Sequence, residues 1–143
     1  MDIVRGAVAG TVATGAMSAL MLAADRRMGE QPPDAIAKKA AHFVGADPSE
    51  SQADAMAVGL HIGFGATVGA VYALLPRVGR PVARALAVSM AVYAASYQGW
   101  VPALRILPPA DEDHPVRQKT MIAAHVVYGV VLGLTEDRLR ARR

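Results

Sequence analysis

The 143-residue chain contains no cysteine, which excludes disulfide bonds, cysteine-ligated zinc or iron–sulfur sites and thiol nucleophiles. Aromatic residues make up only 5% of the sequence, whereas hydrophobic residues make up 53% and are mostly alanine, valine, leucine and methionine. Small and aliphatic side chains of this kind are typical of closely packed helices. The net charge of +3 comes without a long basic run or interleaved aromatics, so nucleic acid is not an expected partner.

Charge is absent from four long stretches of the chain, residues 6–24, 55–75, 85–104 and 120–135. About 20 apolar residues cross the hydrocarbon core of a bilayer, and the shortest stretch does so if Lys119 and Arg138 extend to the interfaces. We therefore predict one all-α domain, residues 1–143, that spans the lipid bilayer four times. The expected transmembrane helices lie at about residues 4–26, 48–75, 81–105 and 116–139.

Two other arrangements fit part of this pattern. A soluble alanine-rich four-helix bundle has the same number of helices, but it needs charge on the outer face of each helix, and these stretches have none. A cleavable signal over residues 1 to about 24 needs a basic start, whereas Arg5 is offset by Asp2. We therefore expect the first stretch to be a retained helix.

The flanking charges predict the orientation. With four spans both termini lie on one side, and that side carries eight arginines against three acidic residues. The opposite side carries seven basic residues against nine acidic ones. Arginine is concentrated around the turn 76–82 and in the C-terminal tail. The positive-inside rule then predicts a multi-pass protein of the bacterial inner membrane with both termini in the cytoplasm.

The first outer loop is expected to hold a short amphipathic helix, in "PPDAIAKKAAHFVG" at residues 32–45. Such a helix lies on the membrane surface or caps the bundle. Gly45 is the expected stop, and Asp47 in "DPSE" is the expected N-cap of the next helix. The predicted apolar stripe consists of Ile36, Ala40, Phe43 and Val44.

The second half of the chain follows the order of the first. Each half has a helix, a Pro-Pro corner ("QPPD" at 31–34, "LPPADED" at 107–113) and a helix with His-x-x-(Phe/Tyr)-Gly-x-x-x-Gly, at 61–69 and 125–133. Because each half contains two spans, both halves enter the membrane from the same side. We therefore expect a pseudo-twofold 2+2 repeat bundle with halves at about 1–78 and 79–143.

Glycines mark the expected helix contacts. Glycines four residues apart let a second backbone approach closely, and in lipid such contacts replace the hydrophobic effect as the source of helix association. On a helical wheel each motif histidine lies on the glycine face of its helix. The glycines expected at these contacts are Gly6, Gly10, Gly65, Gly69, Gly129 and Gly133.

His61 and His125 are expected at a shared depth, because each lies a few residues inside the outer end of its helix. The helix over 81–105 runs outward to the same layer, where Pro102 is expected to kink or end it. Met17 and Met21 of the first helix reach this layer too. The predicted polar cluster consists of Ser18, Tyr93, Ser96, Tyr97, Gln98 and Tyr128.

Three functions fit the histidine pair. Neutral imidazoles can hydrogen-bond neighbouring helices and fix their register, which needs no cofactor. His61 and His125 can instead ligate haem b or a metal ion, because bis-histidine ligation across facing helices of a bundle is a known geometry. They can also titrate along a path for protons or a small solute. The first function is favoured, because no cysteine or acidic ligand lies in the four stretches.

No catalytic constellation is recognisable: the sequence has no Gly-x-Ser-x-Gly, no phosphate-binding loop and no nucleophile beside a base. The three carboxylates of "ADEDH", residues 110–114, are expected to be solvated. We therefore predict a non-enzymatic membrane helix bundle. It would be a structural or accessory component of a homo-oligomer or of an assembly with other membrane subunits.

The segments "HIGFGATVGAVYALLP" and "AAHVVYGVVLGLTEDRLRARR", together with the Pro-Pro corner, resemble the YagU-like group of small bacterial inner-membrane proteins. The resemblance covers the second to fourth helices and extends more weakly to the first. It implies a four-helix protein of the inner membrane and supplies no catalytic residues. The first outer loop is shorter in this chain than in that group.

Overall fold

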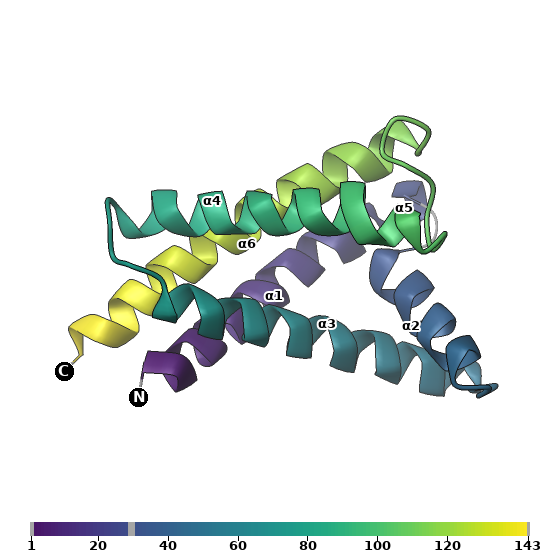
Figure 1. Cartoon of the computed structure of the whole chain (residues 1–143), viewed down its shortest axis with the longest axis horizontal. Helices are drawn as coiled ribbons and strands as arrows, with labels where there is room; N and C mark the ends of the chain where they lie inside the picture. The colour runs from purple at the N-terminus through teal and green to yellow at the C-terminus, as the bar shows by residue number, and fades with distance from the viewer. Residues whose placement is uncertain (1, 29–30, 143) are drawn as a thin grey trace.

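The structure, a computed structural model, describes residues 2–28 and 31–142, and all regular secondary structure in them is helical, which confirms the predicted all-α class. α4, the π-helical turn η1 and α5 follow one another without a break and form one long helix. Figure 1 shows the long helices running along the molecule, with α2 across one end. The elements are α1 (Asp2–Met28), α2 (Pro32–Phe43), α3 (Glu50–Leu74), α4 (Pro81–Ala95), η1 (Ser96–Trp100), α5 (Val101–Ala103) and α6 (Pro115–Ala141).

Helix starts follow local chemistry. Proline stands at the beginning of α2, α4 and α6, where its missing N–H has no intrahelical partner to lose. The N-cap of α3 is Ser49, whose backbone N–H donates to Oε1 of Gln52 at 2.9 Å. The prediction of Asp47 as the N-cap is wrong, because the Ser-x-x-Gln spacing forms the capping contact and α3 begins after it.

α2 is the expected short helix of the first loop. It packs against α3, and its buried residues are Ala35, Ala37 and Ala41. Of the predicted apolar stripe, Ile36 packs against the cluster of Ala35, Val101 and Leu107, whereas Phe43 and Val44 are 88% and 75% exposed. The stripe is thus partly turned to the bundle and partly to the surroundings. Gly45 ends the segment with a φ of +70°, a left-handed conformation that favours glycine.

Glycines of both helices form the contact between α1 and α3. A Cβ atom at Gly10 would lie 2.2 Å from the carbonyl oxygen of Gly65, and one at Gly6 would lie 2.3 Å from that of Gly69. No side chain larger than hydrogen fits at these positions. Next along α1, the hydroxyl of Thr14 donates to the carbonyl oxygen of Gly10 at 2.8 Å and covers Gly65.

Glycines on α6 accommodate α4. A Cβ atom at Gly129 would lie 2.9 Å from Cα of Leu86, and one at Gly133 would lie 2.7 Å from Cα of Val82. α6 also packs against α1, so it joins the α1–α3 pair to α4. In this second pair only one helix contributes glycines to the contact.

The two halves share only part of their contacts. α1 packs on α3 as α4 packs on α6, and α1 also packs on α6. A twofold relation would add a contact between α3 and α4, which is not among the principal helix contacts of the described residues. Figure 1 shows these two helices diverging from the turn that joins them. The pseudo-twofold repeat therefore stays a prediction, and the place of the missing contact is taken by a cavity.

Tyr72 stabilises the turn between α3 and α4. Its side chain is fully buried, and its hydroxyl donates to the carbonyl oxygen of Pro81 at 2.9 Å. The guanidinium carbon of Arg84 lies 4.4 Å from the centroid of the Tyr72 ring, a cation–π contact. Nearby on α6, Glu136 is buried and accepts a hydrogen bond from Arg140. Polar contacts thus stabilise this end of the molecule.

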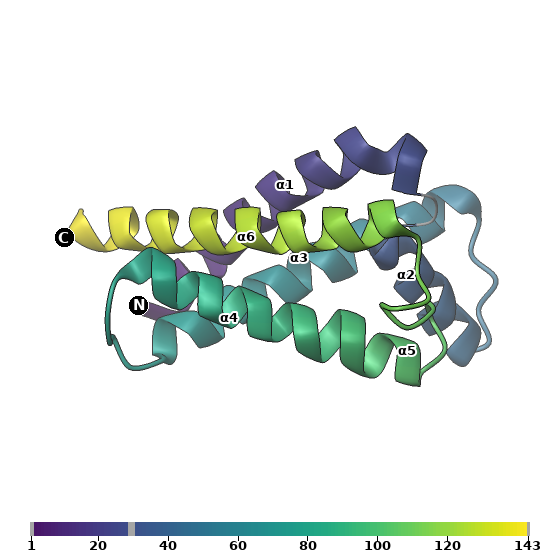
Figure 2. The ribbon, with the colours of Figure 1, turned by 90° about the horizontal axis from the view of Figure 1, so that it is seen from above.

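The outward faces of the helices are largely apolar. α1 over Asp2–Ala24 and α3 over Glu50–Leu74 are long and apolar enough to cross a membrane, judged by length and composition. Both termini lie at the same end of the molecule (Figures 1 and 2). The large apolar side chains exposed on α1, α3 and α6 include Val8, Val12, Leu22, Val58, Leu60, Ile62, Phe64, Val71, Ile122, Val126 and Leu134.

Candidate functional site

His61 of α3 and His125 of α6 line one cavity of about 430 Å³. Residues of every helix contribute to the cavity, and it lies where α3 and α4 diverge. The lining consists of Thr14, Met17, Met21, Pro32, Pro33, Ile36, Gly59, Leu60, His61, Gly63, Phe64, Gly65, Val68, Ser89, Val92, Ser96, Tyr97, Trp100, Val101, Met121, His125 and Tyr128.

The ring of His61 is fixed by α1. Its Nδ1 lies 3.2 Å from Oγ of Ser18, which stands on the same face of α1 as Gly10 and Thr14. The glycine contact between α1 and α3 sets the register of this pair, because it holds the two helices close together beside the histidine. The packing glycines and the histidine orientation are therefore linked.

The ring of His125 is fixed by its own helix and by α4. Its Nδ1 lies 2.8 Å from the carbonyl oxygen of Met121, and its ring meets Tyr93 edge-on at a centroid distance of 5.3 Å. Tyr93 in turn stacks on Tyr97 at 5.5 Å. The hydroxyl of Ser89 donates to the carbonyl oxygen of His125 at 2.6 Å. Both side chain and backbone of His125 are thus held in place.

The π-helical turn η1 positions the aromatic residues of this wall. Pro102 lacks the N–H that would bond one turn back, and its ring crowds the carbonyl there, so the helix widens before it. The helix continues through α5 and ends soon after, with Arg105 at a φ of +53°. Tyr97 is buried, and Trp100 lies at the rim with its Nε1 donating to Oγ of Ser96 at 3.2 Å. Pro102 therefore distorts the helix as well as preceding its end.

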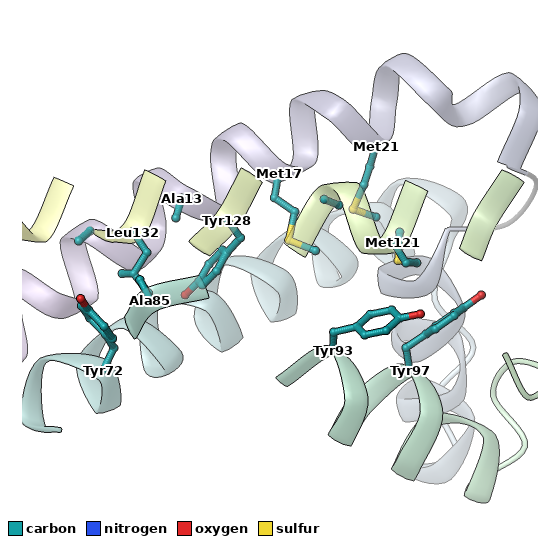
Figure 3. Close-up of a cluster of buried hydrophobic side chains, with 12 residues drawn as sticks. Ala13, Met17, Met21, Tyr72, Ala85, Tyr93, Tyr97, Met121, Tyr128 and Leu132 are labelled. Carbon is teal, nitrogen blue, oxygen red and sulfur yellow. The ribbon is translucent and has the colours of Figure 1, made fainter. Parts of the chain in front are cut away.

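Three methionines form the apolar side of the site. Met17 and Met21 reach in from α1 and Met121 from α6, and all three are buried. Figure 3 shows them facing the rings of Tyr93 and Tyr97 on α4 and η1. Flexible thioether side chains fill irregular space beside aromatic rings.

Asp113 is a buried acidic residue beside the cavity whose contacts were not predicted from the sequence. It was expected to be solvated, but its side chain is 2% exposed and forms an ion pair with Arg117 at 2.5 Å. It also accepts a hydrogen bond from the hydroxyl of Tyr97, and the backbone N–H of His114 donates to it at 2.7 Å. The spacing Asp-x-x-x-Arg at the start of α6 was the available signal. This pair links the loop before α6 to the aromatic wall of the cavity.

Most of the predicted polar cluster surrounds the histidines. Ser18 bonds His61, Tyr93 contacts His125, and Ser96 and Tyr97 line the cavity with Tyr128. Tyr128 also donates to the carbonyl oxygen of Gly65 at 2.6 Å. Gln98 does not join the cluster: it is exposed, because the π-helical turn directs its neighbours Tyr97 and Trp100 to the cavity instead.

The site supplies hydrogen-bonding groups rather than a metal cluster. Within residues 2–28 and 31–142 no three histidine, aspartate or glutamate side chains are grouped so that they could hold a metal ion. The imidazoles of His61 and His125 both line the cavity.

Comparison with known proteins adds one match. The model of a family described as "Family of unknown function (DUF6789)" matches residues 1–143. No curated protein and no solved structure matches the chain. The matched residues include the histidine pair, the cavity and Asp113, so the candidate site lies entirely within the family region. The chain therefore belongs to the DUF6789 family of unknown function.

Proposed function

We propose that the protein is an integral helix bundle of the bacterial inner membrane. The observation that carries this proposal is the surface of the four long helices between their charged ends. Large apolar side chains are exposed on α1, α3 and α6, and every exposed residue of α4 is an alanine. A helix in water directs charged residues outward, whereas these faces suit lipid.

The placement of charge supports four spans with both termini in the cytoplasm. The arginine-rich turn between α3 and α4 and the tail of α6 lie at the end that holds both termini (Figure 1). The acidic loops lie at the other end. α6 has the shortest uncharged stretch and spans the bilayer with Lys119 and Arg138 reaching the interfaces. The likeness to the YagU-like group agrees with this arrangement.

The role we propose is structural and non-enzymatic. The protein would be an accessory component of a homo-oligomer or of an assembly with other membrane subunits. Packing of the GxxxG type holds α1 on α3, and the opposite face of α3, with Val71 and Leu74 exposed, is left for lipid or a neighbouring subunit.

Single cysteines test the membrane placement without background, because the chain has none of its own. With a membrane-impermeant maleimide, Ala46→Cys should react in intact spheroplasts and Val78→Cys only after the membrane is opened. Val126→Cys, on the lipid-facing side of α6, should react only after denaturation. All three positions are exposed in the folded chain, so equal labelling of all three in the carbonate-soluble fraction would reject the proposal.

Binding of haem b or a metal ion is a second candidate function, and one observation favours it. The Met121 carbonyl can only accept a hydrogen bond, so Nδ1 of His125 donates to it, and Nε2 of the neutral ring is left with a lone pair. Metal-ligating histidines are held in this manner. His61 and His125 would be the ligands of a membrane redox protein.

If haem occupies the site, the purified protein will show a Soret band that is lost in His61→Ala and in His125→Ala. The matched control is His42→Ala, at an exposed position of α2, and this variant should keep the band. A colourless protein that carries no stoichiometric metal and does not bind added haemin would exclude this function.

A further inference from the structure

The cavity between α3 and α4 has the size and walls of a small-molecule site. Its volume of about 430 Å³ lies within the range of roughly 300 to 1,000 Å³ found for ligand pockets. The glycines of α3 differ in their surroundings: a Cβ atom at the exposed Gly59 or Gly63 would meet nothing within 4 Å, in contrast to one at Gly65, which α1 covers.

Nearly every polar side chain in the cavity is already engaged by the protein. The hydroxyls of Thr14, Ser89 and Tyr128 donate to backbone carbonyls, that of Tyr97 donates to Asp113, and that of Ser96 accepts from Trp100. Among the described residues that line the cavity, the side-chain nitrogens that remain without a hydrogen bond are Nε2 of His61 and Nε2 of His125. The cavity therefore offers two imidazole nitrogens in an apolar enclosure.

The hydrogen-bonding character of one of these nitrogens is fixed by its ring. Nδ1 of His125 donates to a carbonyl, so its Nε2 is an acceptor in the neutral ring. Nδ1 of His61 is hydrogen-bonded to the hydroxyl of Ser18, which can donate or accept, so Nε2 of His61 is a donor in one tautomer and an acceptor in the other.

From this pairing we infer that the cavity binds a lipid-soluble, uncharged molecule that carries a hydroxyl group. A hydroxyl is the smallest group that both donates and accepts a hydrogen bond, so it would donate to His125 and could pair with either tautomer of His61. Among the described residues, no lysine, arginine, aspartate or glutamate lines the cavity, so a charged ligand would lack a partner in this part of the chain. Bis-histidine haem, in contrast, would need lone pairs on both Nε2 atoms.

The apolar body of the ligand would lie against the methionines. Its end would extend out of the cavity through the opening between α3 and α4. The rim carries Phe64, Leu60 and Trp100, which are 48%, 46% and 37% exposed. With the membrane placement proposed above, on which this inference rests, the opening faces the acyl chains. The ligand would then enter sideways from the bilayer.

Trp100, the single tryptophan of the chain, is a built-in reporter at this rim. Brominated molecules quench tryptophan on contact, so the probes are 11-bromo-1-undecanol, 1-bromoundecane and 11-bromoundecanoic acid, titrated into the full chain in detergent micelles. We expect saturable quenching by the alcohol at concentrations about tenfold below those needed for the alkane, the selectivity of one net hydrogen bond.

Amino-acid substitutions distinguish binding of the probe in the cavity from partition of the probe into the micelle. His61→Leu and His125→Leu should each lose the preference for the alcohol. His42→Leu, at an exposed position of α2, should keep it. Val92→Phe keeps both histidines and enlarges a side chain that lines the cavity, so it should lower quenching by all three probes. It guards against the case in which a histidine variant fails to fold.

Several results would overturn the inference. Equal quenching by alkane and alcohol in the unchanged protein would show partition only, and stronger binding of the acid would show that a carboxyl group is recognised instead. A protein purified with haem that excludes the alcohol would assign the cavity to the redox function. Carbonate extraction of the membranes from which each variant is purified reports membrane integration separately, so failure of the ligand and failure of the membrane placement are distinguishable.

Discussion

Replacing Asp113 by alanine is expected to lower the free energy of unfolding by about 3–5 kcal/mol, the range for breaking a buried ion pair. The variant leaves the guanidinium of Arg117, whose side chain is 11% exposed, without its acid. Nε of Arg117 is already buried without a hydrogen-bond partner in the described residues, so little compensation is at hand. Trp100 fluorescence during denaturation in detergent micelles measures the change.

Two further variants serve as comparisons for the loss of stability in Asp113→Ala. Asp111→Ala removes an exposed carboxylate two residues away and should change stability by less than about 0.5 kcal/mol. Tyr97→Phe removes one hydrogen bond but leaves the ion pair, with an expected loss of about 1 kcal/mol. If Asp113→Ala is as mild as Asp111→Ala, the carboxylate is solvated, as the loop composition first indicated.

Replacing Gly10 by alanine is expected to destabilise the protein by about 3 kcal/mol, the upper range for overpacking a close contact. The added Cβ would lie 2.2 Å from a backbone oxygen of α3, which cannot rotate away as a side chain could. α1 and α3 must therefore separate, and the pairing of Ser18 with His61 should weaken with them. Denaturation of the variant in micelles gives the magnitude.

Gly15→Ala is the matched control on the same helix. A Cβ atom there meets nothing within 4 Å, and glycine to alanine in an open helix position is neutral or stabilising, by up to about 1 kcal/mol. The two substitutions should thus have opposite signs. Equal effects would mean that the glycine contact between α1 and α3 does not hold the bundle together.

Much of the helical pattern could be predicted from the sequence, because it rests on local chemistry. Uncharged stretches, prolines at helix starts and Gly45 after α2 act over a few residues, and the helices lie close to the expected ranges. The N-cap of α3 was predicted wrongly, because Ser49 with Gln52 competed with Asp47 for the capping contact.

The candidate site was predictable only in part. The repeated spacing pointed to His61 and His125, since a histidine in an apolar run needs a partner. The burial of Asp113 was not predictable from the composition of its loop, because it depends on Tyr97 arriving from another helix. Gln98 was misplaced because the widened turn before Pro102 changes which side chains face inward.

The sequence by itself determined that the chain folds as helices with glycine-lined faces and places charge only at their ends, because periodicity and the absence of charge are local properties. Only the tertiary structure decided that α3 and α4 part where a twofold repeat would join them. It also decided that most hydroxyls of the cavity are already bonded to backbone carbonyls or to Asp113. The physical reason is that close glycine packing holds α3 against α1 while α4 packs on α6, so a cavity remains between α3 and α4 with two imidazole nitrogens that have no partner in the described residues.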